Sequence, residues 1–191
     1  MSGTLILIVG PSGVGKDTLL AGARDKLESN TYFRFARRHI TRPKEAGGED
    51  HEPVSLRAFN AAESAGSYPL SWRAHQLSYG IHKDELKPLL EGRSVVVNAS
   101  RSILDKARRK FENVAIVSIT APEPLLRARL QARARETAAE IENRIARAGE
   151  FQPKGDDVFE LSNNGAIDEG VLNLSALLVR LDALYRMDTR A

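Results

Sequence analysis

The chain has 191 residues, of which 42% are hydrophobic and 28% charged, with a formal net charge of +3 and no cysteine. This composition is ordinary for a folded globular domain and excludes disulfides and thiol chemistry, while the small positive charge does not by itself predict nucleic-acid binding. The N-terminal apolar run is too short for a signal peptide, and no segment approaches the roughly 20 apolar residues of a membrane span, so we expect a single-domain cytoplasmic enzyme.

A buried strand, a glycine-rich loop and a helix are predicted in that order at the N-terminus. Leu5–Val9 is a short apolar run, residues 10–16 fit the pattern G-x-x-x-x-G-K, and residues 19–27 continue with apolar residues at helical spacing. Such a loop directs its backbone amides and the positive end of the helix dipole at phosphate, and Lys16 would reach the β- and γ-phosphates. The motif predicts ATP binding by Gly10, Pro11, Ser12, Gly13, Val14, Gly15, Lys16, Asp17 and Thr18.

The residue after the lysine departs from this motif. The pattern places Ser or Thr there as a ligand of Mg²⁺, whereas this chain has Asp17 followed by Thr18. A carboxylate is a suitable hard-oxygen ligand for Mg²⁺, directly or through water. Asp17 is also consistent with an ordinary first-turn aspartate that has no metal role. We expect Asp17 and Thr18 to serve the metal.

Residues 34–80 differ from the rest of the chain, because they alternate in polarity and are rich in Pro and Gly. We expect a small inserted lobe of short antiparallel strands and turns, with one helix near residues 56–64 that begins after Ser55. A lobe inserted after the first helix is a plausible binding site for a phosphoryl acceptor.

Strands and helices alternate through the remaining residues. Buried strands are expected at residues 95–97, 114–119 and 159–162, and helices at residues 102–112, 123–135, 138–149 and 167–186. This alternation predicts an α/β fold with a parallel sheet, a P-loop NTPase three-layer sandwich. The core would comprise residues 1–33 and 81–191, with a helical lid at about residues 127–150.

Two clusters of arginine suit phosphate, because a guanidinium donates parallel hydrogen bonds and stays charged. The first cluster lies at residues 37–42, at the start of the lobe, and the second lies in the expected lid. For the second cluster, the alternative to phosphate binding is a solvated helix face on which the arginines pair with glutamates. No general base accompanies them, which agrees with an acceptor that is itself an ionised phosphate. The second cluster comprises Arg127, Arg129, Arg133, Arg135, Arg144 and Arg147.

These segments together resemble guanylate kinases in order and spacing over nearly the whole chain. The resemblance rests on Gly10–Thr18, Thr41-Arg42, Ser78-Tyr79-Gly80 and the arginine-rich segment around residues 133–144. It implies a core with a phosphate loop, an acceptor-binding lobe and an arginine-bearing lid. It also implies that Asn163, in the turn at residues 162–165, lies near the adenine of ATP.

The chain departs from guanylate kinases where they bind guanine. Ala74 and Asn98 stand near the places of two carboxylates that bind the base, and Arg38 replaces a serine. Segments such as Arg-Arg-His-Ile-Thr-Arg-Pro, Ala-His-Gln-Leu-Ser-Tyr-Gly-Ile and Val-Asn-Ala-Ser-Arg instead resemble the ribose 1,5-bisphosphate phosphokinases of bacterial phosphonate breakdown. That resemblance implies that ATP phosphorylates the 1-phosphate of ribose 1,5-bisphosphate, giving 5-phosphoribosyl 1-diphosphate and ADP.

The resemblance also implies the residue roles. Lys16, Arg133 and Arg144 would be catalytic. Among the charged residues 49–51, whose alternative is an ordinary solvated loop, Glu49 is the candidate for binding sugar hydroxyls or a metal. A guanylate kinase that binds its base differently, and a guanylate-kinase-like binding module without catalysis, are the alternatives. The small-molecule acceptor would be bound by Arg38, Arg42, His75, Tyr79, Asn98 and Arg101.

Overall fold

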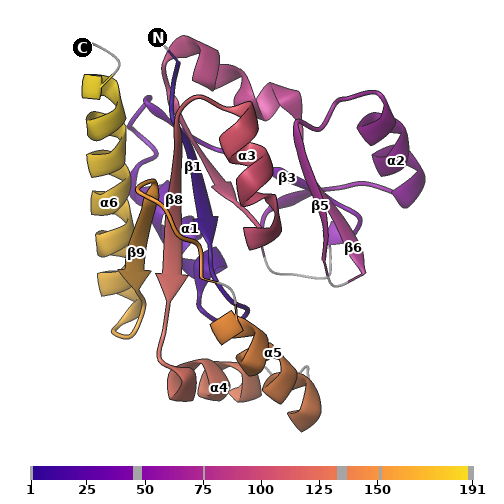
Figure 1. Cartoon of the computed structure of the whole chain (residues 1–191), viewed down its shortest axis with the longest axis vertical. Helices are drawn as coiled ribbons and strands as arrows, with labels where there is room; N and C mark the ends of the chain where they lie inside the picture. Colours follow the sequence, from indigo (N-terminus) through magenta and orange to yellow (C-terminus); the bar gives the residue numbers. More distant parts are fainter. Residues whose placement is uncertain (1, 45–48, 75, 133–136, 151, 189–191) are drawn as a thin grey trace.

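The central layer is a five-stranded parallel sheet with strand order β2-β7-β1-β8-β9 (Figure 1). The computed structural model describes residues 2–44, 49–74, 76–132, 137–150 and 152–188, without the side chains of 147–150 and 188. The strands are β1 (Leu5–Val9), β2 (Phe33–Phe35), β7 (Ser94–Asn98), β8 (Val114–Thr120) and β9 (Val158–Ser162). The predicted parallel α/β sheet is confirmed.

Both faces of the sheet are covered, which is why its central strands are continuous apolar runs. Leu5, Leu7 and Val9 of β1 pack on one face, in a cluster with α3 (Leu104–Lys110). Ile6 and Ile8 pack on the other face with α1 (Lys16–Lys26) and α6 (Ile167–Asp188). Val171, Leu174, Leu178 and Leu181 form an apolar stripe on α6 that is buried in this second cluster, so its role is core packing.

The lobe contains a second, four-stranded sheet in the order β4-β3-β6-β5. Its elements are β3 (Arg38–Ile40), β4 (His51–Pro53), α2 (Leu56–Ser64), β5 (Leu70–Ala74) and β6 (Leu77–Ile81). As predicted, Ser55 caps α2, since its hydroxyl accepts a hydrogen bond from the Ala58 amide at 3.2 Å. The expected all-antiparallel arrangement is wrong for one pair: β3 and β4 are parallel, with Arg38 beside His51 and Ile40 beside Pro53, whereas β3 with β6 and β5 with β6 are antiparallel.

The helices α4 (Glu123–Ala132) and α5 (Ala138–Glu150) lie at the end of the sheet toward which β1 and β8 point (Figure 1). A capping box begins α5, with Thr137 and Glu140 exchanging hydrogen bonds of 2.8 and 3.3 Å. The end of the helix expected at 123–135 falls on residues outside the described ones. No described helix has the length and apolar character that crossing a membrane requires.

Two short helical segments differ from the prediction. The helix expected at 102–112 begins as the 3₁₀ helix η3 (Arg101–Ile103) before α3, because the Ser100 hydroxyl caps the Ser102 amide. A further 3₁₀ helix, η2 (Lys83–Glu91), was not predicted; it contains Pro88, which lacks the amide that an α-helix interior uses. The domain boundaries inferred from sequence stay a prediction, with β2 at residues 33–35 paired into the core sheet.

The buried stripe of α6 yields a stability test. Leu178 has no exposed surface, so Leu178→Ala should lower the free energy of unfolding by about 2–5 kcal/mol through lost burial and a residual cavity. Leu172 on the same helix is 54% exposed and serves as the control, with an expected change within about 0.5 kcal/mol. Urea denaturation of both variants measures the difference, and equal losses would contradict this packing.

Candidate functional site

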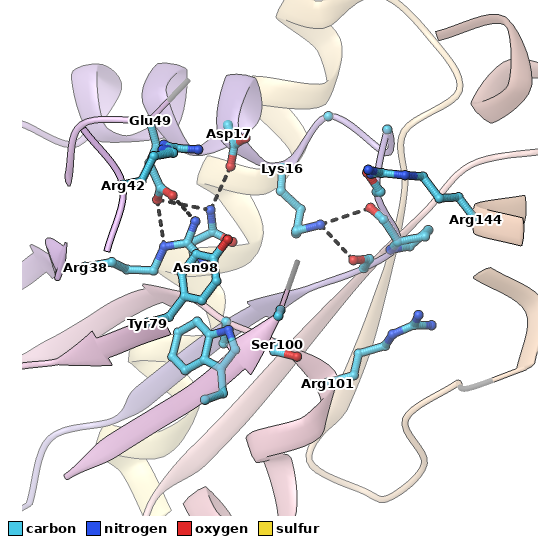
Figure 2. A pocket seen from close by; sticks show the side chains of 18 residues that line it. Lys16, Asp17, Arg38, Arg42, Glu49, Tyr79, Asn98, Ser100, Arg101 and Arg144 are labelled. Carbon is cyan, nitrogen blue, oxygen red and sulfur yellow. Dashed lines mark hydrogen bonds and ion pairs between the residues drawn. The ribbon is translucent and has the colours of Figure 1, made fainter. Parts of the chain in front are cut away.

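A cavity of about 440 Å³ lies between the glycine-rich loop and the lobe (Figure 2). Its walls come from the loop, the strands of the lobe, the end of β7 and the lid helix α5. Five cationic side chains and two carboxylates line it, so the cavity is predominantly positive. The lining residues are Gly10, Pro11, Ser12, Gly13, Gly15, Lys16, Asp17, Arg38, Arg42, Glu49, Trp72, Ala74, Tyr79, Asn98, Ala99, Ser100, Arg101 and Arg144.

The loop between β1 and α1 makes a turn that requires glycine. Gly15 caps α1 with φ +95°, and a Cβ there would lie 2.6 Å from Nδ2 of Asn163. At Gly10, with φ +152°, a Cβ would lie 2.4 Å from the Ile119 carbonyl oxygen. Lys16 extends across the turn and donates to the carbonyls of Gly10 and Pro11 at 2.7 and 3.0 Å (Figure 2). The ammonium therefore lies where the turn and the helix N-terminus converge.

Two side chains hold this turn from behind. Asn163, at the end of β9, is 4% exposed and donates its amide to the Val14 carbonyl at 2.7 Å. Arg129 of α4 donates to the same carbonyl at 3.3 Å and to the Asn163 carbonyl at 3.2 Å. The contact predicted between Asn163 and ATP stays a prediction, since the side chain does not line the cavity. Arg129, one of the clustered arginines, supports the loop, which sequence spacing did not indicate.

The half of the cavity on the side of the lobe is built around Arg38. Its guanidinium forms a bidentate ion pair with Glu49 and lies 5.1 Å from the Tyr79 ring centroid. Tyr79 stacks on Trp72 with centroids 5.3 Å apart and ring planes 3° from parallel. Burial raises the pKa of the Tyr79 hydroxyl, although Arg38 opposes that shift, so the phenol stays neutral. The aromatic pair gives the arginine a firm apolar support.

Asn98 connects the loop helix with the lobe. It lies at the carboxyl end of β7, and its Nδ2 donates to Oδ1 of Asp17 at 2.7 Å. The same nitrogen lies 3.5 Å from Oε2 of Glu49, at the limit of a hydrogen bond (Figure 2). Sequence reasoning placed Asn98 near the acceptor but missed that it joins both carboxylates, because these lie 81 and 49 residues away along the chain.

Arg42 lines the cavity beside a histidine that serves the backbone. His51 is 1% exposed, and its ring nitrogens lie 3.1 and 3.0 Å from the carbonyl oxygens of Arg42 and Glu49. Its Nδ1 also lies 3.4 Å from a guanidinium nitrogen of Arg42. Asp50, which lies between Glu49 and His51 in the sequence, forms an ion pair with Arg37 at 3.2 Å. His51 thus holds the backbone at Arg42 and at Glu49.

The lid arginines have different partners. Arg144 of α5 reaches the loop, where it donates to the Ser12 hydroxyl at 2.6 Å and lines the cavity. Arg127 pairs with Glu123 at 2.9 Å and with Glu142, and these hydrogen bonds raise its pKa. The solvated-face alternative therefore applies to Arg127 and not to Arg144. Arg133, like His75 in the lobe, lies outside the described residues.

Two further predicted residues have contrasting positions. Arg101, at the start of η3, lines the cavity beside Ser100; burial lowers its pKa, yet an arginine remains cationic at neutral pH. Thr18 is exposed on α1 and is not part of the lining. The structure therefore brings Arg101 to the predicted site and leaves Thr18 at its margin.

The donor set fits a Mg²⁺ ion held mainly by substrate. Among the described residues, no three His, Cys, Asp or Glu side chains gather as a metal site. Asp17 offers one carboxylate in the cavity wall, and the Asn98 bond to Oδ1 orients its second oxygen. Mg²⁺ in phosphoryl-transfer sites is commonly bound by one or two carboxylates together with substrate phosphates and water.

The chain is similar in sequence to bacterial ribose 1,5-bisphosphate phosphokinases. It is 43% identical to the ribose 1,5-bisphosphate phosphokinase PhnN of Rhizobium etli, over 92% of this chain and 89% of that protein. The PhnN of Chromobacterium violaceum is 45% identical over 87% of this chain and 88% of that protein. The bifunctional ribose 1,5-bisphosphokinase-thymidine phosphorylase of Roseobacter denitrificans is 44% identical over 93% of this chain, which spans only 26% of that longer protein.

Solved structures agree on the fold. The guanylate kinase of Anaplasma phagocytophilum superposes with a TM-score of 0.63 over 94% of this chain and 86% of that one, at 20% identity. This likeness concerns the fold alone, and it confirms the predicted guanylate-kinase-like architecture. No family model matches the chain.

The glycine at the start of α1 can be tested directly. Gly15→Ala should lower stability by more than the roughly 1–2 kcal/mol of a left-handed alanine, because its Cβ would also displace Asn163. ATP binding should weaken at least about tenfold as the turn opens. Gly66→Ala is the control, since Gly66 has φ +71° with nothing within 4 Å of a Cβ. Urea unfolding and calorimetric ATP titration measure both; indistinguishable variants with unchanged ATP affinity would contradict the assignment.

Proposed function

The chain belongs to the ribose 1,5-bisphosphate phosphokinase family, and on this premise we propose that it phosphorylates the 1-phosphate of ribose 1,5-bisphosphate with ATP. The products are 5-phospho-α-D-ribose 1-diphosphate and ADP, as a step of phosphonate breakdown in the cytoplasm. One observation carries the proposal beyond family membership: a single cavity joins the phosphate loop to an acceptor half that contains Arg38, Arg42 and Arg101.

The reaction needs positioning and charge stabilisation more than acid–base chemistry. An oxygen of the acceptor 1-phosphate forms a bond to the γ-phosphorus of ATP, while the bond from that phosphorus to the β,γ-bridging oxygen breaks and ADP leaves. The acceptor oxygen is already ionised at neutral pH, so no proton has to be removed. This agrees with a cavity in which cations predominate.

Lys16 and the loop amides bind the donor phosphates in this proposal. The ammonium of Lys16 lies within the turn, beside the N-terminus of α1, where both the charge and the amides favour phosphate oxygens. Asn163 and Arg129 act through the loop, whose Val14 carbonyl they hold. Asp17 is the residue that would hold a Mg²⁺ ion, with Thr18 as a secondary candidate, and the ion would supply positive charge that neutralises the donor phosphates.

Arg144 faces the transferring group in this proposal. Its bond to Ser12 brings a lid guanidinium to the phosphate loop, where charge spreads over three equatorial oxygens during transfer. Arg133, outside the described residues, keeps its predicted place in the same clamp as part of the proposal. This arrangement disfavours the non-catalytic binding module, which has no need of Lys16, Arg144 and an intact loop together.

The acceptor's two phosphates suit the arginines of the lobe and of η3. Arg38 and Arg42 come from the lobe wall of the cavity, and Arg101 comes from the start of η3. In this proposal, each end of a small bisphosphate meets a guanidinium. Tyr79 and Asn98 line the space between, and His75 keeps its predicted acceptor contact as a proposal. A guanylate kinase is the second candidate, but Ala74 and Asn98 supply no carboxylate for a purine edge.

The acceptor assay tests this function. Each missing charge-assisted hydrogen bond to guanine should cost about 1.5–3 kcal/mol, so GMP should react at least about a hundredfold more slowly than ribose 1,5-bisphosphate. Coupled ADP detection measures the rates, and ³¹P NMR should show the coupled phosphorus pair of a 1-diphosphate. EDTA should abolish turnover if Mg²⁺ is required. Efficient conversion of GMP, with ribose 1,5-bisphosphate inert, would reverse the assignment to guanylate kinase.

The two lid arginines provide a matched pair of variants. Arg144→Ala should lower kcat by about 10³-fold or more with little change in the KM for ATP, because its charge acts on the transferring group. Arg127→Ala removes a guanidinium from the same lid, paired only with lid glutamates in the contacts seen, and should leave turnover nearly unchanged. Steady-state kinetics compares them. Normal turnover in Arg144→Ala would contradict a role for this arginine at the transferring group.

A further inference from the structure

We propose that Glu49 binds the hydroxyl groups of the acceptor's ribose ring and so makes the site specific for ribose over deoxyribose. The inference rests on the proposed function, and it gives a substrate contact to a carboxylate that the phosphate chemistry does not use. Three features carry it: the fixed orientation of Glu49, the charges around it, and the hydrogen-bonding capacity that remains on its oxygens.

The Glu49 carboxylate is held in one orientation within the cavity wall. Its side chain is 15% exposed, and both oxygens are engaged by the fork of Arg38, whose side chain is 11% exposed (Figure 2). Arg38 in turn lies over the stacked rings of Tyr79 and Trp72. A carboxylate with such support presents its remaining lone pairs in a fixed direction, as a specific contact requires.

The surrounding charge limits what Glu49 can touch. A carboxylate repels phosphate, yet this one lies among arginines in a cavity suited to two phosphates. The part of ribose 1,5-bisphosphate that a carboxylate can approach is the uncharged middle, where the 2- and 3-hydroxyls are located. Carboxylates bind ribose hydroxyls in the same way in dinucleotide-binding folds.

The carboxylate also has acceptor capacity left for these hydroxyls. An ionised carboxylate offers about four lone-pair sites, of which the fork of Arg38 uses two. Nδ2 of Asn98 lies 3.5 Å from Oε2 of Glu49 and donates a shorter hydrogen bond of 2.7 Å to Asp17. The hydrogen bond from Asn98 to Glu49 is therefore the weaker of the two. Through Asn98, the carboxylate lies one side chain from the loop helix and hence close to the place of transfer.

A purely positioning role for Glu49 predicts something different. If Glu49 only holds Arg38, its loss weakens phosphate binding, and every acceptor with the same phosphates suffers equally. If Glu49 binds hydroxyls, its loss affects ribose more than an analogue that lacks the hydroxyl. The ratio of kcat/KM between ribose and deoxyribose acceptors therefore separates the two roles.

The experiment measures kcat/KM for ribose 1,5-bisphosphate and for its 2-deoxy and 3-deoxy analogues. The wild-type chain should prefer ribose over at least one analogue by about 10- to 100-fold, the value of a hydrogen bond to a charged group. Glu49→Gln should reduce that preference to a few-fold, and Glu49→Ala should bring it close to one. Where turnover is too slow, calorimetric Kd values give the same ratio.

Asp50→Asn is the matched control, because this neighbouring carboxylate pairs with Arg37 and does not line the cavity. It should keep the wild-type preference. A preference that survives in both Glu49 variants, or a wild-type chain that does not distinguish the analogues, overturns the inference while leaving the phosphokinase function intact. A wild-type chain inert toward ribose 1,5-bisphosphate rejects the function, and the inference with it.

Discussion

The Val14 carbonyl is the point on which the donor site depends. This oxygen accepts hydrogen bonds from Asn163, at the end of β9, and from Arg129 of α4. The last core strand and the helix α4 of the lid therefore hold the same peptide of the loop. The curvature of that loop gathers amides and the Lys16 ammonium at the helix N-terminus. Because Gly15 lies against Asn163 with no room for a Cβ, the loop packs tightly on the residue that follows β9.

The positively charged side chains of the cavity lie in two groups, and the side-chain amide of Asn98 lies between the groups. Lys16 and Arg144 belong to the loop side, and Arg38 and Arg42 to the lobe side. Asp17 and Glu49 lie at this place, where Asn98 contacts both carboxylates. Phosphates from two substrates need cations on either side, while a metal and a sugar need oxygen acceptors between them. This order of charges suits transfer from one phosphate to another.

The lobe is built as a support for arginine. Trp72 and Tyr79 pack into the cluster that covers one face of the central sheet, so the acceptor wall is continuous with the core. Their stacked rings carry the Arg38 guanidinium, and His51 fixes the backbone beside Arg42. The proposed acceptor-binding residues are therefore positioned by buried groups, which is how a site keeps the geometry that phosphoryl transfer requires.

Local sequence by itself determined four of the five core strands, the phosphate loop and the capped helices, because apolar period, glycine and capping residues act over a few positions. The three-residue strand β2 was not predicted. The resemblance carried by short segments predicted Arg38, Arg42 and Arg101 as acceptor-binding residues, and all three line one cavity. Only the tertiary structure decided which partner each clustered arginine has. Arg127 pairs with lid glutamates, Arg129 donates to the backbone of the loop, and Arg144 donates to Ser12 in the cavity wall. It also decided that Glu49 faces Arg38 and Asn98, since such contacts join residues far apart in the chain and depend on how the lobe packs against the sheet.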